Sequence, residues 1–278
     1  KLESIVIPRS VTEIRDHAFM GCSGLRNVTL NEGLLRIELE AFHSCRSLTD
    51  IDIPSTVDEL DGSAFAFCSS LENITVGNGS STYVSVDGMV YSSDMTSLII
   101  CPPGRTSAVI TPGTRTIKGG AFDPCNKLME INIPDSVEEI GYGALGGNLL
   151  ERITVSEGNM YYKSIDGMLY SKDGTRFIRC PNKKSGNITV TSGVTEIAEW
   201  AFGDCNDISG IKLPNSLISI KRYAFWFCSK IEELNIPKNV RDINDEAIVG
   251  GGALKSINVA AGNKWYRSID GVLYHYDL

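Results

Sequence analysis

The stretch LTDIDIPSTVDELDGSAFAFCSS, from Leu48 to Ser70, decides how this chain folds. Its apolar residues stand at positions that recur elsewhere in the chain, and polar residues fill most of the positions between them. A segment of about 23 residues cannot bury its own apolar side, so it must stack on copies of itself. The fixed apolar positions of this stretch are Leu48, Ile51, Ile53, Val57, Leu60, Ala64, Phe65 and Cys68.

Copies of this stretch run along the whole chain. Six of the steps between successive copies are 22 or 23 residues long, and the other two are 57 and 58 residues long. Short units therefore alternate with longer units that carry an insert of about 35 residues. The nine units begin at Leu2, Leu25, Leu48, Leu71, Leu128, Leu150, Ile208, Ile231 and Leu254.

Each unit combines two extended segments with one turn. The first segment, as at Ile51 and Ile53, is β-branched and has the period of a strand. A proline such as Pro54 ends this strand because it lacks an N–H, and a V-x-x-I run gives a second extended segment. The A-F-x-x-C segment that follows has the spacing of one helical turn. Stacked copies predict a solenoid of short parallel strands and short helical turns, with columns of Ile, Val, Phe and Cys in its core.

The longer units share one kind of insert. The sequences GNGSSTYVSVDGMVYSSDMTSLIICPPG (residues 77–104) and GNMYYKSIDGMLYSKDGTRFIRCPNKK (residues 158–184) each contain an Asp-Gly pair and then a run that ends in tyrosine. A turn and a second run ending at Cys-Pro follow, which is typical of a β-hairpin. A third copy begins at Gly262 and is cut short. We expect these hairpins to protrude from the solenoid.

Composition and charge narrow the classes of function. The chain has 278 residues, of which 42% are hydrophobic and 22% are charged, as in a folded soluble protein. Its formal net charge of -8 argues against nucleic acid as a partner, because phosphate binding needs a basic surface. No apolar run approaches the roughly 18 residues that span a bilayer. We expect any targeting segment to lie outside these residues.

The eight cysteines occupy only two positions of the repeat pattern. No C-x-x-C pair is present, so the spacing is wrong for a zinc ribbon or a redox motif. Buried free thiols are the preferred interpretation, while disulfides between neighbouring coils and a metal site stay open. The turn position holds Cys22, Cys45, Cys68, Cys125, Cys205 and Cys228, and the insert position holds Cys101 and Cys180.

Catalytic and metal-binding patterns are weak in this sequence. The three histidines form no Ser-His-Asp or Cys-His arrangement that the repeat does not already explain. The Asp-Gly pairs at Asp166 and Asp173 could belong to a calcium loop, but a hairpin turn explains them more simply. We therefore predict a protein without enzyme activity, cofactor or metal.

Two sets of residues are candidates for ligand binding, although a solvated sheet surface and a filled turn layer would explain them as well. Outward strand positions give a polar, weakly acidic face, and turn positions carry large aromatic side chains. The candidate strand-face residues are Asp50, Asp52, Asn73, Glu130, Asn132, Lys212, Glu233 and Asn235. The candidate aromatic patch consists of Phe67, Tyr223, Trp226 and Phe227.

The repeat L-x-x-I-x-I-P-x-S-V-x-x-I-x-x-x-A-F-x-x-C is similar to the BspA-type leucine-rich repeat, also called the Treponema pallidum type. The resemblance covers the whole chain, and the D-G-[MV]-[LV]-Y motif of Asp166 to Tyr170 resembles inserts in bacterial members. The chain departs from the pattern at Asn148 and Gly251, which replace Cys, and at Asn31, which replaces Pro. The resemblance implies a right-handed leucine-rich-repeat solenoid, by convention of the α/β class. Relatives are secreted or cell-surface proteins of oral and gut bacteria and of some mucosal protozoa, associated with adhesion to host matrix proteins and other bacteria.

These observations lead to one expected architecture and one expected function. We expect a single domain over residues 1–278, with short repeats at 2–70, 128–149 and 208–253 and long repeats at 71–127, 150–207 and 254–278, the last truncated. The expected function is that of a monomeric, extracellular or surface-displayed binding module for a protein or glycan ligand, host matrix proteins among them, with no nucleic acid and no membrane insertion. The first alternative is a structural spacer that displays another domain, and the second is an enzyme.

Overall fold

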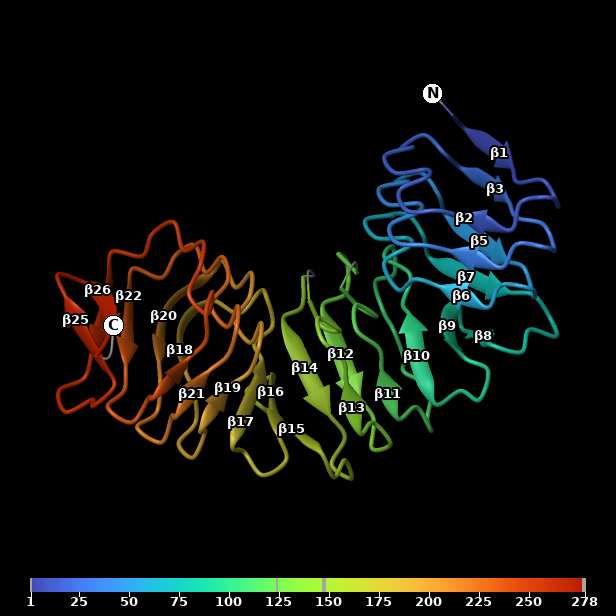
Figure 1. Cartoon of the computed structure of the whole chain (residues 1–278). Helices are drawn as coiled ribbons and strands as arrows, with labels where there is room; N and C mark the ends of the chain where they lie inside the picture. Colours follow the sequence, from blue (N-terminus) through green and yellow to red (C-terminus); the bar gives the residue numbers. More distant parts are fainter. Residues whose placement is uncertain (1, 124, 147–148, 277–278) are drawn as a thin grey trace. The chain divides into compact units, whose positions relative to one another are not determined.

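The computed structural model describes residues 2–123, 125–146 and 149–276 (Figure 1). Contacts divide the chain into two compact units, Lys1–Leu149 (unit 1) and Leu150–Leu278 (unit 2). Each unit is a stack of coils built from short strands, so the predicted solenoid is confirmed. The expectation of one continuous domain stays a prediction. The departure from the repeat at Asn148 lies outside the described residues.

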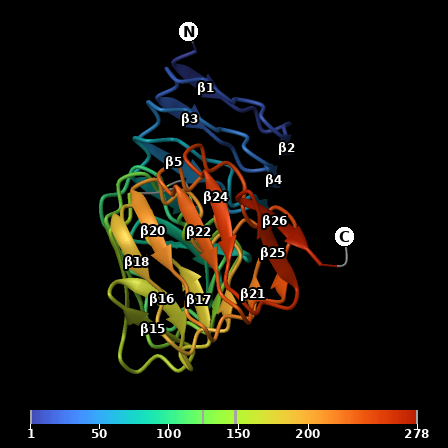
Figure 2. The same cartoon turned by 90° about the vertical axis from the view of Figure 1, so that its left-hand side faces the viewer.

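The I-x-I segments form a first column of strands in each unit. Within these columns, pairs of strands one coil apart bond in parallel, as Ile51 pairs with Ile74 in unit 1 and Ile188 pairs with Ile211 in unit 2. Figure 2 shows strands of this column in unit 2 side by side. The column in unit 1 consists of β1 (Ser4–Val6), β3 (Asn27–Thr29), β5 (Asp50–Ile53), β7 (Asn73–Val76) and β12 (Glu130–Ile133). The column in unit 2 consists of β14 (Arg152–Val155), β18 (Gly186–Thr189), β20 (Ile208–Lys212), β22 (Glu233–Ile236) and β24 (Ser256–Val259).

The V-x-x-I segments form a second column of two-residue strands. These strands also pair in parallel, as in the pairing of Ile14 with Ile37 and of Ile197 with Ile220. The column in unit 1 consists of β2 (Glu13–Ile14), β4 (Arg36–Ile37), β6 (Glu59–Leu60), β11 (Thr116–Ile117) and β13 (Glu139–Ile140). The column in unit 2 consists of β19 (Glu196–Ile197), β21 (Ser219–Ile220) and β23 (Asp242–Ile243).

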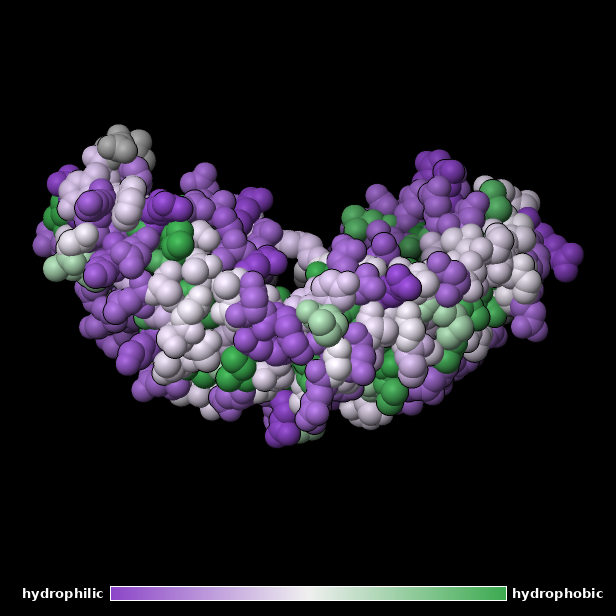
Figure 3. Space-filling view, turned by 90° about the horizontal axis from the view of Figure 1, so that it is seen from below, coloured by the Kyte–Doolittle hydropathy of each residue, from purple (hydrophilic) through white to green (hydrophobic). Residues whose placement is uncertain are grey.

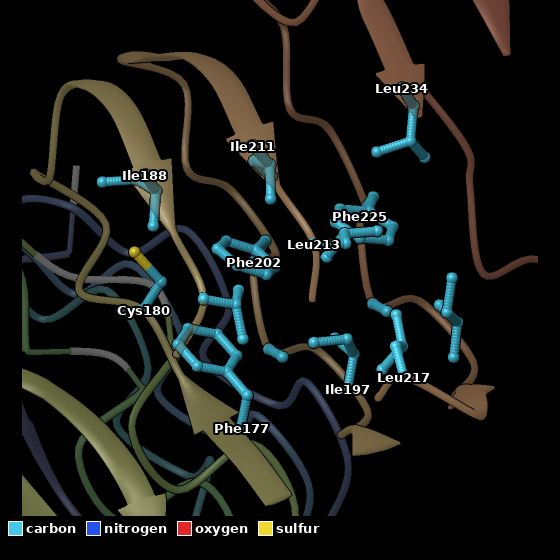
Figure 4. Packing of buried hydrophobic residues seen from close by; sticks show 14 of the residues in the cluster. Phe177, Cys180, Ile188, Ile197, Phe202, Ile211, Leu213, Leu217, Phe225 and Leu234 are labelled. Carbon is cyan, nitrogen blue, oxygen red and sulfur yellow. The ribbon is translucent and has the colours of Figure 1, made fainter. Parts of the chain in front are cut away.

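Stacking gives each unit a core made of repeated columns. In unit 2 the rings of Phe177, Phe202 and Phe225 lie one above the next, with centroids 4.6 and 5.3 Å apart (Figure 4). In unit 1 the rings of Phe42 and Phe65 stack in the same way at 5.5 Å. All five rings are buried, so the apolar positions of the repeat supply the core that a single coil could not.

The turn after the second strand is not helical, and here the prediction is wrong. Within the described residues no segment forms a helix. In the coil of Phe42, the Cys45 N–H bonds the Phe42 carbonyl at 3.1 Å, but the Phe42 N–H bonds the Ala64 carbonyl of the next coil at 2.8 Å. Glu40 and Ser44 also take positive φ values of 51° and 60°. A right-handed helix needs negative φ and hydrogen bonds within the segment throughout, and this turn has neither. Its hydrogen bonds to the next coil hold neighbouring coils together instead.

Each complete insert forms a three-stranded antiparallel meander, one strand more than the sequence pattern predicts. The Asp-Gly pair makes its first turn, in which Asp87 and Gly88 both have positive φ (48° and 70°), as a type I′ hairpin requires. The last strand of each meander then joins the second column by pairing in parallel with β11 or β19. The insert strands are β8 (Tyr83–Val86), β9 (Met89–Ser92) and β10 (Ser97–Ile100), then β15 (Tyr162–Ile165), β16 (Met168–Ser171) and β17 (Arg176–Arg179), and finally β25 (Tyr266–Ile269) and β26 (Val272–His275).

Candidate binding surfaces

The outward side chains of the first strand column give each unit a polar strand face. Side chains alternate along a strand, so Ile51 and Ile53 of β5 are buried while Asp50 and Asp52 are exposed. The surface shown in Figure 3 is mainly hydrophilic, with apolar residues in small separate patches. All the predicted strand-face residues are exposed, namely Asp50, Asp52, Asn73, Glu130, Asn132, Lys212, Glu233 and Asn235.

A shallow hollow marks the strand face of unit 2 at Gly210. Asn187 lies beside Gly210 on the neighbouring strand, and an open space of about 620 Å³ extends over the outer side of β18, β20 and β22. Lys212, Glu233 and Asn235 line this space, so the structure brings together three of the predicted residues. A second hollow of about 350 Å³ shares Lys212 and Asn235 and continues over β24. The two hollows form one groove across the strands, here called the Gly210 groove, lined by Asn187, Gly210, Lys212, Glu233, Asn235 and Asn258.

The Gly210 groove carries charges of both signs. At its edge the Lys230 ammonium is paired with the Asp207 carboxylate at 2.7 Å. Lys212 and Glu233, by contrast, form no ion pair with any of the described residues. Both charged groups are therefore available to a polar ligand, and neither has an existing pair to break.

In unit 1 two of the predicted strand-face residues, Asp50 and Asp52, are hydrogen-bonded to neighbouring threonines. The Thr49 hydroxyl donates to the Asp50 carboxylate at 2.6 Å, and the Thr75 hydroxyl donates to the Asp52 carboxylate. Asp52 and Arg9 line a hollow of about 320 Å³. The strand face is therefore hollowed at a separate place in each unit. The remaining predicted residues of unit 1, Asn73, Glu130 and Asn132, lie at exposed positions of β7 and β12.

Four aromatic side chains gather on the turns of two neighbouring coils in unit 2. We call Trp200, Tyr223, Trp226 and Phe227 the turn-face cluster. The Trp200 ring lies 5.1 Å from Tyr223 and 5.6 Å from Trp226, and Trp226 lies 4.9 Å from Tyr223 and 5.0 Å from Phe227. The structure thus brings together three residues of the predicted aromatic patch and adds Trp200. Its position one coil before Tyr223, 23 residues earlier, is the sequence signal that identifies it.

Phe67, the fourth residue of the predicted aromatic patch, lies in unit 1. Its ring contacts His43 at 5.0 Å and is 49% exposed. Phe67 occupies the same turn position as Phe227, and the two residues share a positive φ, at 59° and 51°. Phe67 is therefore a counterpart of Phe227 outside the turn-face cluster.

Charged groups surround the turn-face cluster. The Arg222 guanidinium lies 4.5 Å from the centre of the Tyr223 ring and bonds the Glu246 carboxylate through Nε at 2.8 Å. That bond lowers the pKa of Glu246. Asp204 lies close by, since its N–H bonds the Trp226 carbonyl at 2.8 Å, and burial raises the pKa of its carboxyl.

A buried arginine supports the cluster from below. Arg179 is only 6% exposed, donates to the Trp200 carbonyl and bonds Asn182 Oδ1 at 2.7 Å. It fixes the turn that carries Trp200 through charge-assisted hydrogen bonds. The repeat pattern could not identify this role, because the corresponding residue of the first insert is Ile100.

The cysteine side chains pack in the core, and their thiols form hydrogen bonds with backbone carbonyls. All eight are free. The Cys68 thiol donates to the Phe42 carbonyl at 3.0 Å, and the Cys228 thiol donates to the Phe202 carbonyl at 3.1 Å. Burial raises the pKa of Cys125 and of Cys228, which keeps both thiols neutral.

The carboxylates of the inserts stabilise turns. Asp173 accepts hydrogen bonds from the Ser171 hydroxyl at 2.6 Å and from the Thr175 N–H at 2.9 Å, which lowers its pKa to about 2. In the part of the chain that the structure describes, no group of three or more His, Cys, Asp or Glu residues is placed to hold a metal ion. The described residues also include no helix of the length and apolarity needed to cross a membrane.

Comparison with known families identifies the class of protein. The family model described as "BspA type Leucine rich repeat region (6 copies)" matches residues 1–104, 103–182 and 174–268. These ranges cover nearly the whole sequence, so the chain belongs to the BspA-type leucine-rich-repeat family. No curated protein matches it.

Solved structures of bacterial proteins resemble this chain. The pneumococcal vaccine antigen PcpA is 25% identical over 94% of this chain, with a TM-score of 0.53. A leucine-rich cell surface protein from Faecalibacterium prausnitzii A2-165 is 27% identical over 88% of this chain, with a TM-score of 0.58. The chain spans 62% and 60% of the length of these two structures. A leucine-rich-repeat protein from Eubacterium ventriosum, 18% identical over 98% of this chain and 81% of its own, shares the fold with a TM-score of 0.58.

Proposed function

We propose that this chain is a non-enzymatic binding module of a secreted or cell-surface protein, which adheres to proteins or glycans of a host or of other microbes. Its family membership supports this proposal, as does its likeness to a bacterial vaccine antigen and to a bacterial cell surface protein. The repeat also explains the cysteines as packing residues, and Asp173 stabilises an insert turn, so the outward side chains of the strands and turns are the candidates for recognition.

The Gly210 groove is the observation that carries this proposal. At the position of Gly210 the adjacent strands of unit 2 carry Asn187 and Glu233, and the end of the Asn187 side chain lies beside the glycine in the groove. Asparagine amides and the unpaired charges of Lys212 and Glu233 line it. Such a surface both donates and accepts hydrogen bonds, which suits a polar macromolecular ligand.

The proposal is tested by a substitution at Gly210 that fills the Gly210 groove and leaves the backbone of the strand in place. Gly210 does not have a positive φ, and an added side chain would first meet only the flexible end of Asn187. The variant Gly210→Arg should therefore fold and should lower affinity at least tenfold for ligands found on a panel of purified matrix proteins and glycans. The matched control is Asn27→Arg, at the same outward strand position in unit 1, which should change affinity less than twofold.

Two results would overturn the proposal. If Gly210→Arg and Asn27→Arg bind panel ligands equally well, the groove does not form the binding site. If the unaltered chain binds nothing on the panel, the structural spacer becomes the better explanation. Replacing the chain by a linker of equal length should then preserve the function of the whole protein.

A further inference from the structure

Three residues of the turn-face cluster have a strained backbone conformation. Trp200, Tyr223 and Phe227 have φ values of 58°, 55° and 51°, where a residue with a Cβ is strained. Equivalent turn positions in other coils hold glycine, as at Gly143 and Gly250, or polar residues such as Glu40 and Ser44, and all of these have positive φ as well. The turn accepts glycine and polar residues at these positions, so it does not itself require the three large aromatic side chains.

The surface of the cluster is uneven. The rings of Trp200 and Trp226 meet at 49°, those of Tyr223 and Trp226 at 84°, and those of Trp226 and Phe227 at 60°. No pair is close to parallel, so these rings do not form the flat platform on which a sugar ring stacks. Ring faces and ring edges that alternate in this way leave spaces that fit apolar side chains better than they fit a flat sugar ring.

The residue types and charges of the cluster favour a protein partner with basic groups. Tryptophan, tyrosine and arginine dominate the energetics of protein interfaces, and all three meet here. Three carboxylates, those of Glu199, Asp204 and Glu246, lie near the cluster, against two guanidinium groups, the exposed one of Arg222 and the buried one of Arg179. Because Arg222 is already paired with Glu246, the excess charge that a partner meets is negative.

We propose that the turn-face cluster is a second binding site, separate from the Gly210 groove, and that it takes a protein segment in which apolar side chains are flanked by Lys or Arg. Phe227 is 45% exposed and lies against the backbone of Gly250, so it presents its outer face to solvent. The apolar side chains of the partner fill the spaces between the rings, and its cations meet the carboxylates and ring faces.

The experiment uses a random-peptide display library selected on the immobilised chain and tests two glycine variants. Phe227→Gly removes the ring and relieves the positive φ, and Phe67→Gly makes the same change in unit 1, outside the cluster. Selected peptides should be enriched in apolar residues next to Lys or Arg. Their affinity should fall at least tenfold for Phe227→Gly and less than twofold for Phe67→Gly. The melting temperature of Phe227→Gly should equal or exceed that of Phe67→Gly.

Three outcomes would overturn this inference. Selected peptides that bind Phe227→Gly as tightly as the unaltered chain would place their site elsewhere. Binding on a glycan array that depends on Phe227 would make the cluster a sugar site. A melting temperature of Phe227→Gly well below that of Phe67→Gly would assign the ring to packing. Trp226→Ala repeats the binding test at a residue whose φ is not positive.

Discussion

The phenol oxygen of Tyr266 accepts a hydrogen bond from the backbone N–H of Ile243 at 3.0 Å. Ile243 ends β23, the last strand of its sheet, so its N–H has no further strand to bond. Tyr83 does the same for Leu60 of β6 at 3.1 Å, at the end of the β2-β4-β6 sheet. The tyrosine that opens each of these inserts therefore caps the coil before it, and burial raises the pKa of both phenols.

Removing this cap should weaken the end of unit 2. Tyr266→Phe leaves the Ile243 N–H without its partner in a partly buried place, which should cost about 1–2 kcal/mol of unfolding free energy. Hydrogen exchange at the Ile243 amide should accelerate, and this readout is local enough for a repeat protein. The control is Tyr276→Phe, at a ring that is 51% exposed. Equal exchange at Ile243 in both variants would show that the phenol does not act as a cap.

The strands and the core could be predicted because their signals are periodic. Ile51, Ile53, Phe65 and Cys68 are buried as the pattern requires, and the parallel pairing of coils follows from their spacing. A buried position tolerates few residue types, so the sequence repeats them.

The turns and the binding surfaces could not be predicted as well, because their determinants do not repeat. The helical spacing of inward residues also fits a turn whose N–H groups bond partly within the coil and partly to the next coil. Positive φ is not expected for residues such as Trp200 and Phe227. Gly210 stands out only once its strand is paired with its neighbours, and Arg179 has no counterpart in the other insert. Stacking, rather than local sequence, creates these features.

The stability of the second insert should depend on pH through Asp173. Its folded pKa of about 2 lies below the ordinary value of 3.8, so the hydrogen bonds of its carboxylate stabilise the fold fully above pH 4. That contribution is lost as pH falls from 3.8 through 2. Asp173→Ala should therefore be less stable than the unaltered chain in urea denaturation at pH 7, and the difference should shrink at pH 2. Asp245→Ala, at another exposed carboxylate of unit 2, should change stability little at pH 7. A difference for Asp173→Ala that stays constant with pH would contradict this account.

Thiol reactivity should separate Cys22 from the other cysteines. Cys22 is half-buried in the first coil, while the other seven cysteines are buried. The reagent must reach the sulfur to react with it, and burial blocks that access. Iodoacetamide followed by mass spectrometry should label one cysteine in the folded chain and all eight after unfolding. Cys22→Ser should abolish labelling of the folded chain. Labelling of Cys68 or Cys228 before unfolding would show that the thiol ladder opens in the native state.

A packing defect beside Gly251 should allow the fold to be stabilised. Gly251 replaces the cysteine of the repeat, and a small apolar cavity of about 20 Å³ lies among Phe225, Cys228 and Leu254 next to it. A Cβ at Gly251 would meet Leu254 Cβ at 3.4 Å, so there is room for it at ordinary contact distance. Gly251→Cys should fill the cavity and raise the unfolding free energy by about 1 kcal/mol, because buried apolar surface replaces empty space.

Thermal unfolding measures this gain against Gly252→Cys, whose added Cβ would meet nothing within 4 Å. Both variants restrict the unfolded backbone in the same way, so a difference between their melting temperatures reports the cavity alone. Gly251→Cys should melt higher than both Gly252→Cys and the unaltered chain. A lower melting temperature would mean that the neighbouring side chains already close the space and that the added sulfur strains them. The degenerate last turn is thus the place where restoring the repeat pattern should strengthen the stack.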